Sequence, residues 1–415
     1  MAQNNKSLFW LILVASLGFF VDTADLIIAS LVRASSIIAL DLATDDAQIK
    51  AIGLAFETWQ SWGVLLGGIF FGILGDKIGR LKVLYGSIAL YSISTLLNGY
   101  LSPSWWGNTY IWYCLFRFLS GFGLAAEMGI AITLVSESMK AHKRGIGSMI
   151  IVAFGILGCV VAASLVVFAK LPWDALFKIG GFAGLALLLL RIGVQESTVF
   201  ESQQHAGVEK GAFLALFTNQ DRFKRFAISI LIGLPTYYVV GLPIKFAANF
   251  GKALNIENVS IPIAMMTFYI AMSTGDLICN SISQAIKSRK KLFYFYNTFS
   301  LIAILIFTYF PPSNAWQYHF IYCPLLGLSV GYWALIVTTA SESFGTNLRA
   351  TVTTSVPNFI RSSFIPIATC FTLLEAKIGT IHAGGFIGFV CCVIALIATV
   401  FLKETFGKDL NFEEK

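Results

Sequence analysis

The chain has 415 residues, of which 57% are hydrophobic and only 12% charged, and its mean hydropathy is +0.76. A soluble chain would carry about a quarter charged residues, so this composition excludes a soluble enzyme and predicts an integral membrane protein. The net charge of +7 does not indicate nucleic-acid binding, because basic residues collect in the cytoplasmic loops of membrane proteins.

Apolar runs long enough to cross a bilayer follow one another along the chain. About 20 apolar residues are needed for each crossing, and this rule predicts twelve transmembrane helices. A polar connector over 194–224 separates six spans from six, so we expect an N-terminal bundle over 1–193, a cytoplasmic linker and a C-terminal bundle over 225–415 with a short cytoplasmic tail. The predicted spans are 8–33, 51–74, 83–101, 109–138, 146–169, 174–193, 225–248, 260–286, 292–310, 315–342, 349–376 and 379–402.

The distribution of basic residues predicts the orientation. Twenty of the 29 lysines and arginines fall on the side of the predicted N-terminus, Arg191 among them, and seven fall on the opposite side. Cytoplasmic loops carry an excess of lysine and arginine. We therefore expect both termini in the cytoplasm.

A short charged segment, GILGDKIGRLKVL over residues 72–84, joins the second and third predicted spans. Gly79 marks its bend because glycine tolerates a positive φ, and Asp76 and Arg80 flank that bend. Glycines spaced four residues apart up to Gly72 allow another helix to approach closely in lipid. Gly72, Asp76, Gly79 and Arg80 are therefore gating candidates.

The end of the fourth predicted span recurs at the end of the tenth. The pattern Thr-x-x-Ser-Glu-Ser begins at Thr133 and again 205 residues later at Thr338, and an arginine follows each glutamate by seven residues. Two repeated halves that hold a site near the membrane midplane are typical of secondary transporters. We interpret the glutamates and arginines as mainly structural gate partners, Glu137 with Arg144 and Glu342 with Arg349.

With the spans and the repeat, the hairpin pattern G-x-x-x-D-x-x-G-R-x-K resembles the loop signature of the major facilitator superfamily. Residues 117–127, with the pattern R-x3-G-x-G-x3-E, and the sequence QES at 195–197 resemble the branch of sugar porters and metabolite–proton symporters. The resemblance implies an all-α membrane protein with twelve transmembrane helices in two pseudo-symmetric six-helix bundles. It also implies a secondary transporter.

Ionisable residues inside spans are costly and mostly face a cavity or one another. At 1.5 Å per residue, Asp25 and Arg117 lie at similar depths, and so do Asp276 and Arg361, so either pair can form a contact. Glu57 lies near the outer surface, where water can solvate it. A carboxylate in a cavity can carry protons, although a fixed ion pair is the alternative for each. The proton-coupling candidates are Asp22, Asp25, Glu127 and Asp276, with Asp25 as the first choice.

Substrate-binding candidates are arginines and aromatic residues on helices expected to line a cavity. Arginine can hold a carboxylate through two hydrogen bonds. Aromatic side chains commonly line ligand pockets, although a single one more often packs in a core or at the membrane interface. The candidates are Arg117, Arg361, Trp59, Tyr237, Tyr238, Tyr332 and Trp333.

We therefore predict a secondary active transporter that couples proton entry to the symport of a small polar or charged organic solute by alternating access. The alternatives are import or export of a larger chelate such as a siderophore, and a facilitator without proton coupling. ATP drive is disfavoured because the chain has no G-x-x-x-x-G-K-[ST] loop, and an enzyme because it has no H-E-x-x-H motif. A non-transporting sensor is also disfavoured, because we expect the tail after Phe401 to be too short for a signalling domain. We expect no catalytic residue, metal or cofactor. The expected partners are the solute, protons and the lipid bilayer but no nucleic acid, for a monomer in the bacterial cytoplasmic (inner) membrane.

Overall fold

The computed structural model describes residues 5–105, 107–139, 144–191, 213–345, 347–408 and 414. These residues form helices joined by turns, with no strand among them. Ten helical segments of the described chain are long and apolar enough to cross a membrane. Together with α3 (Asp46–Ile78) and α4 (Arg80–Gly99) they make the twelve transmembrane helices that the sequence predicts.

The N-terminal half consists of six spans, and its fourth span is formed by two successive helices, α5 and α6. Asp45 and Asn108 cap the starts of α3 and α5, because each side chain accepts a hydrogen bond from a backbone N–H in the first turn. The helices of this half are α1 (Asn5–Leu31), α2 (Arg33–Ala39), α3 and α4, α5 (Thr109–Leu124), α6 (Glu127–Ser138), α7 (Arg144–Val167) and α8 (Trp173–Leu190).

The C-terminal half has the same number of spans, but three of them are interrupted. The interruptions coincide with glycine, proline or serine, as at Pro243 inside a π-helical turn and at Ser363 between two helices. Its helices are α10 (Ala215–Thr218), α11 (Gln220–Leu231), α12 (Leu234–Val239), η2 (Val240–Ile244), α13 (Ala247–Ala253), α14 (Ile261–Ile286), α15 (Lys290–Tyr309), α16 (Ala315–Gln317), η3 (Tyr318–Tyr322), α17 (Cys323–Ser329), α18 (Trp333–Ser343), α19 (Arg349–Ser362), α20 (Phe364–Ile378) and α21 (Thr380–Phe401).

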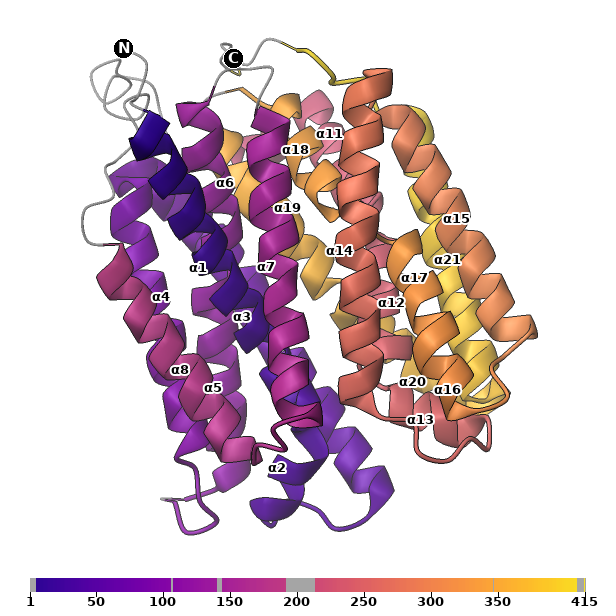
Figure 1. The fold of residues 1–415 in the computed structure, drawn as a ribbon. Helices are drawn as coiled ribbons and strands as arrows, with labels where there is room; N and C mark the ends of the chain where they lie inside the picture. The colour runs from indigo at the N-terminus through magenta and orange to yellow at the C-terminus, as the bar shows by residue number, and fades with distance from the viewer. Residues whose placement is uncertain are drawn as a thin grey trace.

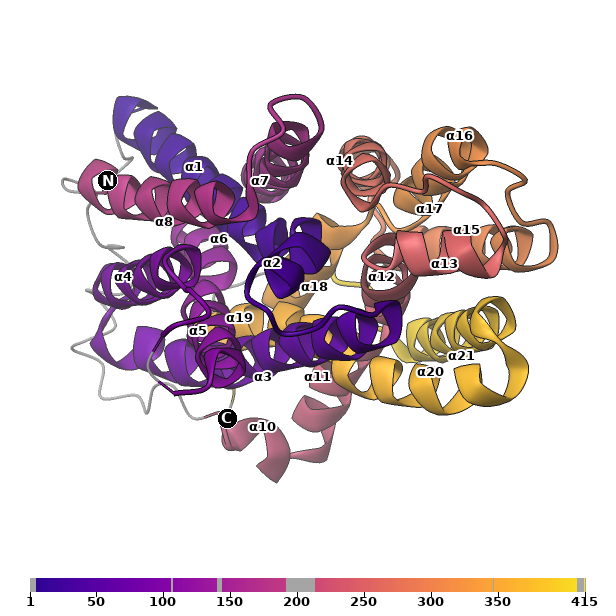
Figure 2. The same cartoon turned by 90° about the horizontal axis from the view of Figure 1, so that it is seen from below.

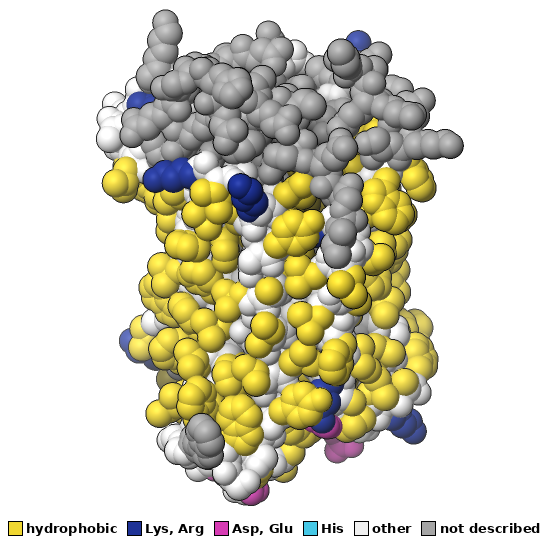
Figure 3. Space-filling view, turned by 90° about the vertical axis from the view of Figure 1, so that its left-hand side faces the viewer, with side chains coloured by type: hydrophobic (Ala, Val, Ile, Leu, Met, Phe, Trp, Pro, Cys, Tyr) yellow, Lys and Arg dark blue, Asp and Glu magenta, His cyan; other side chains and the backbone are white. Residues whose placement is uncertain are grey.

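The two halves lie side by side, and both chain termini are at the same end of the molecule (Figure 1). We call this end the terminal end and the opposite one the distal end. Viewed along the helices, α7 of the N-terminal half lies beside α14 of the C-terminal half, and α3 packs against α19 (Figure 2). Apolar side chains cover the middle of the face in Figure 3, and lysines and arginines gather towards its two ends, as expected for a protein embedded in a bilayer.

The glycines of α3 allow two different helices, α5 and α19, to pack closely against it. A Cβ at Gly63 or Gly67 would collide with the backbone of α5 in the same half. A Cβ at Gly68 would meet the side chain of Asn358, and one at Gly72 would lie 3.5 Å from the Cα of Thr351, both on α19 of the other half. The two successive spacings therefore allow close packing within the N-terminal half and across the interface between the halves.

The predicted linker and the helix that follows it overlap. α11 begins at Gln220, inside the predicted linker, because the Asn219 side chain accepts hydrogen bonds from the backbone N–H groups of Asp221 and Arg222, at 2.9 and 3.3 Å. Residues 192–212 lie outside the described part of the chain. The boundaries at 193, 194, 224 and 225 therefore stay a prediction.

Candidate functional site

A small cavity lies between the two halves, at about the middle of the spans. It offers about 40 Å³ to water-sized molecules in this conformation. Helices α1 and α7 of one half and α12, η2, α14, α18 and α19 of the other contribute its walls. The lining residues are Phe19, Thr23, Leu26, Ile156, Cys159, Thr236, Tyr237, Val240, Tyr269, Met272, Trp333 and Arg361.

Arg361 supplies the positive charge of this cavity. Its guanidinium carbon lies 5.9 Å from the ring centre of Trp333, and its Nη1 donates a hydrogen bond to Oδ1 of Asn358 at 3.4 Å. Its Nε has no hydrogen-bond partner among the described residues, although the side chain is buried. Met128 of the N-terminal half contacts this group, because its sulfur lies 3.9 Å from Nη2 of Arg361 and accepts the indole N–H of Trp333 at 3.3 Å. A donor that is buried without a partner favours an added anion.

Asp22 lies next to the cavity residue Thr23 on α1 and is 1% exposed. It accepts no hydrogen bond from any described residue, and its Oδ1 is fully buried. Ionisable groups from three other helices face it, so the charge of Asp22 is coupled to both halves. The charged neighbours of Asp22 are Glu127, Arg361, Asp25 and Arg191.

Asp25 occupies a different environment, inside the N-terminal half. Its Oδ2 accepts hydrogen bonds from the hydroxyl groups of Thr95 and Ser120, both at 2.9 Å. Arg117 is its charged neighbour, as the matching depths indicate, but the two residues form no direct ion pair. None of the three guanidinium nitrogens of Arg117 has a described partner, and its guanidinium carbon lies 5.6 Å from the ring centre of Phe177. Arg117 is fully buried and does not line the cavity.

Glu127 forms a buried ion pair with Arg191, which is 2% exposed. Arg191 follows α8 at the terminal end, in agreement with the distribution of basic residues, but its side chain turns back into the bundle and meets a carboxylate on α6. Gly18 on α1 makes the space for this pair, since a Cβ there would collide with both charged groups.

Asp276 does not pair with Arg361, although their depths permit it. Its Oδ1 accepts the backbone N–H of Ala334 at 2.9 Å, at the start of α18. The interrupted tenth span exposes the unpaired N–H groups of a helix N-terminus, and a carboxylate satisfies them well. The structure thus gives Asp276 a helix-capping contact.

Among the described residues, four polar contacts of charged side chains join the halves at the distal end. Lys245 bonds with Glu57 at 2.5 Å, and both side chains are buried, at 8% and 4% exposure. Glu57 also accepts a hydrogen bond from Ser30, and Arg33 donates to the backbone oxygen of Lys245 at 3.2 Å. The expectation that water solvates Glu57 is therefore wrong. The other two contacts are the ion pairs Lys50–Glu375 and Lys252–Asp46.

The halves also meet tightly toward the terminal end, where a Cβ at Gly129 of α6 would collide with the Cα of Thr354 on α19. Gly79 adopts a φ of +106° between α3 and α4, as its place at the bend predicts. The side chains of Asp76, Arg80, Glu137 and Arg144 lie outside the described part of the structure. Their gating role therefore stays a prediction.

The structure separates the second predicted gate pair. Glu342 pairs with Arg289, the residue that precedes α15, at 3.0 Å. It also accepts the hydroxyl of Thr405 at 2.8 Å. Arg349 instead donates to the backbone oxygens of Ser341 and Phe344, at 3.3 and 3.4 Å. Both groups thus brace the terminal end of the C-terminal half.

The aromatic candidates divide between the cavity and other places. Tyr237 and Trp333 line the cavity. Trp59 is 46% exposed on the outside of the bundle, where it contacts Phe118 edge-on. Tyr238 packs against α21 at Gly388, and Tyr332 donates its hydroxyl hydrogen to Oδ1 of Asn297 at 2.8 Å. These three residues do not line the cavity.

Several cavity residues were not predicted. Phe19, Thr23 and Leu26 follow helical spacing on α1 and form one wall, and Tyr269 and Met272 form another on α14. The spacing of the α1 residues around Asp22 was visible in the sequence. The sequence could not distinguish them from other apolar residues, because most phenylalanines and leucines of a membrane protein face lipid or core.

Twelve helices arranged in two bundles around a shared buried cavity define a membrane transporter fold. The sequence model of the Major Facilitator Superfamily matches residues 10–369, and the chain belongs to that superfamily. It is thus a transporter and not an enzyme.

Two comparisons cover nearly the whole chain. A protein of Haemophilus influenzae with the provisional name metabolite transport protein is 25% identical over 428 residues, which cover 99% of this chain and 100% of that protein. The solved structure of the proton:xylose symporter XylE bound to 6-bromo-6-deoxy-D-glucose has a TM-score of 0.73 at 17% identity and covers 98% of each chain. This likeness shows the fold alone.

A niacin transporter of Acinetobacter baylyi is 34% identical over 137 residues, which are 32% of this chain and 30% of that protein. A protein of Staphylococcus aureus with the provisional name proline/betaine transporter is 32% identical over 241 residues, or 51% of each chain.

Proposed function

We propose that this chain is a proton-coupled symporter that carries a small organic carboxylate across the membrane by alternating access. The observation that carries the proposal is Arg361, a buried cation in the central cavity whose Nε has no described partner. Buried donors are satisfied in nearly all proteins, so an unpartnered donor that also lines a cavity, as that of Arg361 does and those of Arg117 do not, is a candidate contact for a ligand. A carboxylate fits because the guanidinium can hold its two oxygens at once.

The aromatic wall narrows the chemistry further. Trp333, Tyr237 and Tyr269 line the same cavity as the arginine, and aromatic faces attract flat rings and quaternary ammonium groups. Niacin, proline and betaine, named for the partial relatives, all combine a carboxylate with a ring or a quaternary amine.

We further propose Asp22 as the proton carrier, in place of the first choice Asp25. Two hydroxyl groups already stabilise the carboxylate of Asp25, Glu127 is paired with Arg191, and Asp276 caps a helix. Asp22 accepts no hydrogen bond from the described residues and has Arg361 among its charged neighbours. Protonation of Asp22 would remove a negative charge that competes with the substrate for Arg361.

Contacts between the two halves on either side of the cavity support alternating access. The ion pairs at the distal end and the glycine contacts toward the terminal end join the same two halves. Rocking of one half against the other would break the contacts at one end while the contacts at the opposite end stay in place. Basic residues favour a cytoplasmic terminal end, and the bacterial relatives favour the cytoplasmic membrane.

Uptake by purified protein in liposomes tests the proposal. Radiolabelled niacin, proline and betaine are offered with an inward pH gradient, without a gradient, and with a protonophore. Accumulation above equilibrium that needs the gradient is expected for at least one carboxylate. Equilibration without accumulation would indicate a facilitator, and accumulation that persists with the protonophore would reject proton coupling.

A further inference from the structure

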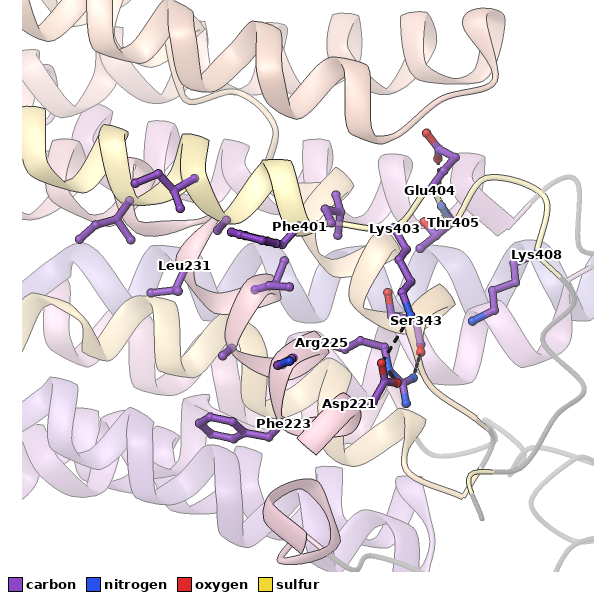
Figure 4. A pocket seen from close by; sticks show the side chains of 17 residues that line it. Asp221, Phe223, Arg225, Leu231, Ser343, Phe401, Lys403, Glu404, Thr405 and Lys408 are labelled. Atoms are coloured by element: carbon purple, nitrogen blue, oxygen red, sulfur yellow. Dashed lines mark hydrogen bonds and ion pairs between the residues drawn. The ribbon is translucent and has the colours of Figure 1, made fainter. Parts of the chain in front are cut away.

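A second cavity, much larger than the central one, opens at the terminal end of the C-terminal half. It has a volume of about 550 Å³ and lies between α11, the end of α21 and the segment that follows α21. This is within the range of about 300–1,000 Å³ that small-molecule sites occupy. Figure 4 shows that its apolar side chains, such as Leu231 and Phe401, lie apart from its charged ones.

The apolar part faces outward, where the bilayer lies. Phe223, Ile397 and Phe401 are 46%, 54% and 67% exposed. Leu231 and Ile394 continue this wall deeper along the two helices. Leu231 lies seven positions after Lys224 on α11, which is about 10 Å along a helix. Ile394 lies seven positions before Phe401, the last residue of α21, and Lys403 follows two residues after that end. Both helices therefore run from a charged end to an apolar end in the same direction.

The charged part has four basic side chains against two acidic ones. These are Lys224, Arg225, Lys403 and Lys408, and Asp221 and Glu404.

Both acidic groups of the pocket are already occupied. Glu404 accepts hydrogen bonds from the hydroxyl of Ser288 at 2.6 Å and from the backbone N–H of Arg289 at 2.9 Å. Asp221 accepts one from Arg225 at 2.8 Å, and the other end of that arginine holds Glu414. Asp221 is thus paired with a cation, and the oxygens of Glu404 are held by neutral donors, so the basic groups of the cavity still outnumber the acidic ones.

Two lysines remain available to a ligand. Lys403 is 79% exposed and reaches Asp221 only at 3.4 Å. Figure 4 shows the two side chains pointing toward each other. Lys224 is exposed and makes no ion pair with any described residue. Both residues belong to the end of the cavity where α11 begins and α21 ends. An ammonium group at this level attracts the anionic lipids of a cytoplasmic leaflet.

We propose that this cavity binds one anionic phospholipid of the cytoplasmic leaflet. Its phosphate lies between Lys224 and Lys403, and an acyl chain runs along Leu231, Ile394, Ile397 and Phe401. The proposal uses the cytoplasmic placement of the terminal end given above. It does not depend on the transported solute or on proton coupling, so uptake assays and lipid binding can fail separately.

A lipid titration of the purified full-length protein in detergent tests this site. The thermal unfolding midpoint is measured against phosphatidylglycerol, phosphatidylcholine with the same chains, and glycerol 3-phosphate. Phosphatidylglycerol is expected to raise the midpoint saturably, and the other two are not. Equal responses to both lipids, or saturation by glycerol 3-phosphate alone, would overturn the proposal, because the site would then select only chains or only phosphate.

Matched variants separate the cavity from general surface charge. Lys224→Gln with Lys403→Gln is expected to raise the half-saturating concentration of phosphatidylglycerol by about fivefold for each lysine. Lys287→Gln with Lys291→Gln removes the same charge at the same end, outside the cavity, and is expected to change it less than about twofold. If both double variants respond alike, the lipid is not held in this cavity.

A third variant tests the path of the acyl chain while it keeps every charge. Ile397→Trp is expected to fill the apolar end and to weaken phosphatidylglycerol binding. Ile397 is exposed to the bilayer, so the substitution leaves the core of the half unchanged. Unaltered lipid binding by Ile397→Trp would show that no chain enters this cavity.

Discussion

Replacement of Lys245 by methionine should open the distal end of the protein. The change keeps an unbranched side chain that is one atom shorter but removes its bond to Glu57, which is buried and joins the two halves. A hydrogen bond to a charged group contributes about 1.5–3 kcal/mol. Water would solvate both groups once the distal end opens, so the loss acts mainly on the closed conformation. The open population should therefore rise about 10- to 150-fold.

Cys159 provides the reporter for this shift. It is 2% exposed and lines the central cavity, so a membrane-impermeant maleimide reaches it only when an end is open. The six other cysteines, which are free thiols like Cys159, are replaced by alanine, and labelling is measured from the distal side. Lys245→Met should accelerate this labelling by the factor given above.

The exposed ion pair of the same interface is the matched control. Lys252 and Asp46 are 62% and 80% exposed at the side chain, and such pairs contribute about 0.2–1 kcal/mol. Lys252→Met should therefore change the labelling rate by less than about fivefold. The reasoning is refuted if Lys245→Met labels at the parental rate, or if both substitutions accelerate labelling equally.

Four further outcomes are expected. Asp22→Asn should abolish accumulation driven by a pH gradient and keep exchange without a gradient; loss of both would indicate misfolding instead. Arg361→Lys keeps the charge but loses the planar fork, and should weaken carboxylate binding by about tenfold or more, measured by calorimetry. Gly129→Ala should hold the terminal end open, because its Cβ would collide with Thr354, and should speed cytoplasmic-side labelling of Cys159. Glu404→Gln should lower the thermal midpoint at neutral pH. Burial alone would raise the pKa of Glu404, but hydrogen bonds from Ser288 and backbone N–H groups hold it below its usual value. This contribution to stability is present above the unfolded pKa of about 4.3 and is lost as the pH falls through the folded value, so the midpoints of variant and parent should converge in acid.

The sequence by itself determined the membrane-spanning helices and their number. Each crossing needs a long apolar run, and that requirement depends only on local composition. The repeat at Thr133 and Thr338 and the bend at Gly79 were also readable, because both depend on residues close together in the chain. The family followed from the same local patterns.

Only the tertiary structure decided which buried charges meet. Depth along a helix is one coordinate, and it matched Asp276 with Arg361 and Asp25 with Arg117. The direction in which each side chain points depends on how the helices rotate and tilt against their neighbours. Because of that packing, Asp276 accepts a hydrogen bond at the N-terminus of α18. The same packing makes Arg361 a charged neighbour of Asp22 in the other half.

The partners that long charged side chains contact could not be predicted from the sequence either. Arg191 follows the last apolar residues of α8, which is typical of a residue at the membrane surface, yet it turns inward to Glu127. The long side chain of Lys245 likewise reaches across the interface between the halves to Glu57. Such pairs form only where a helix on the far side leaves space, as Gly18 does, and that space exists only after the helices have packed.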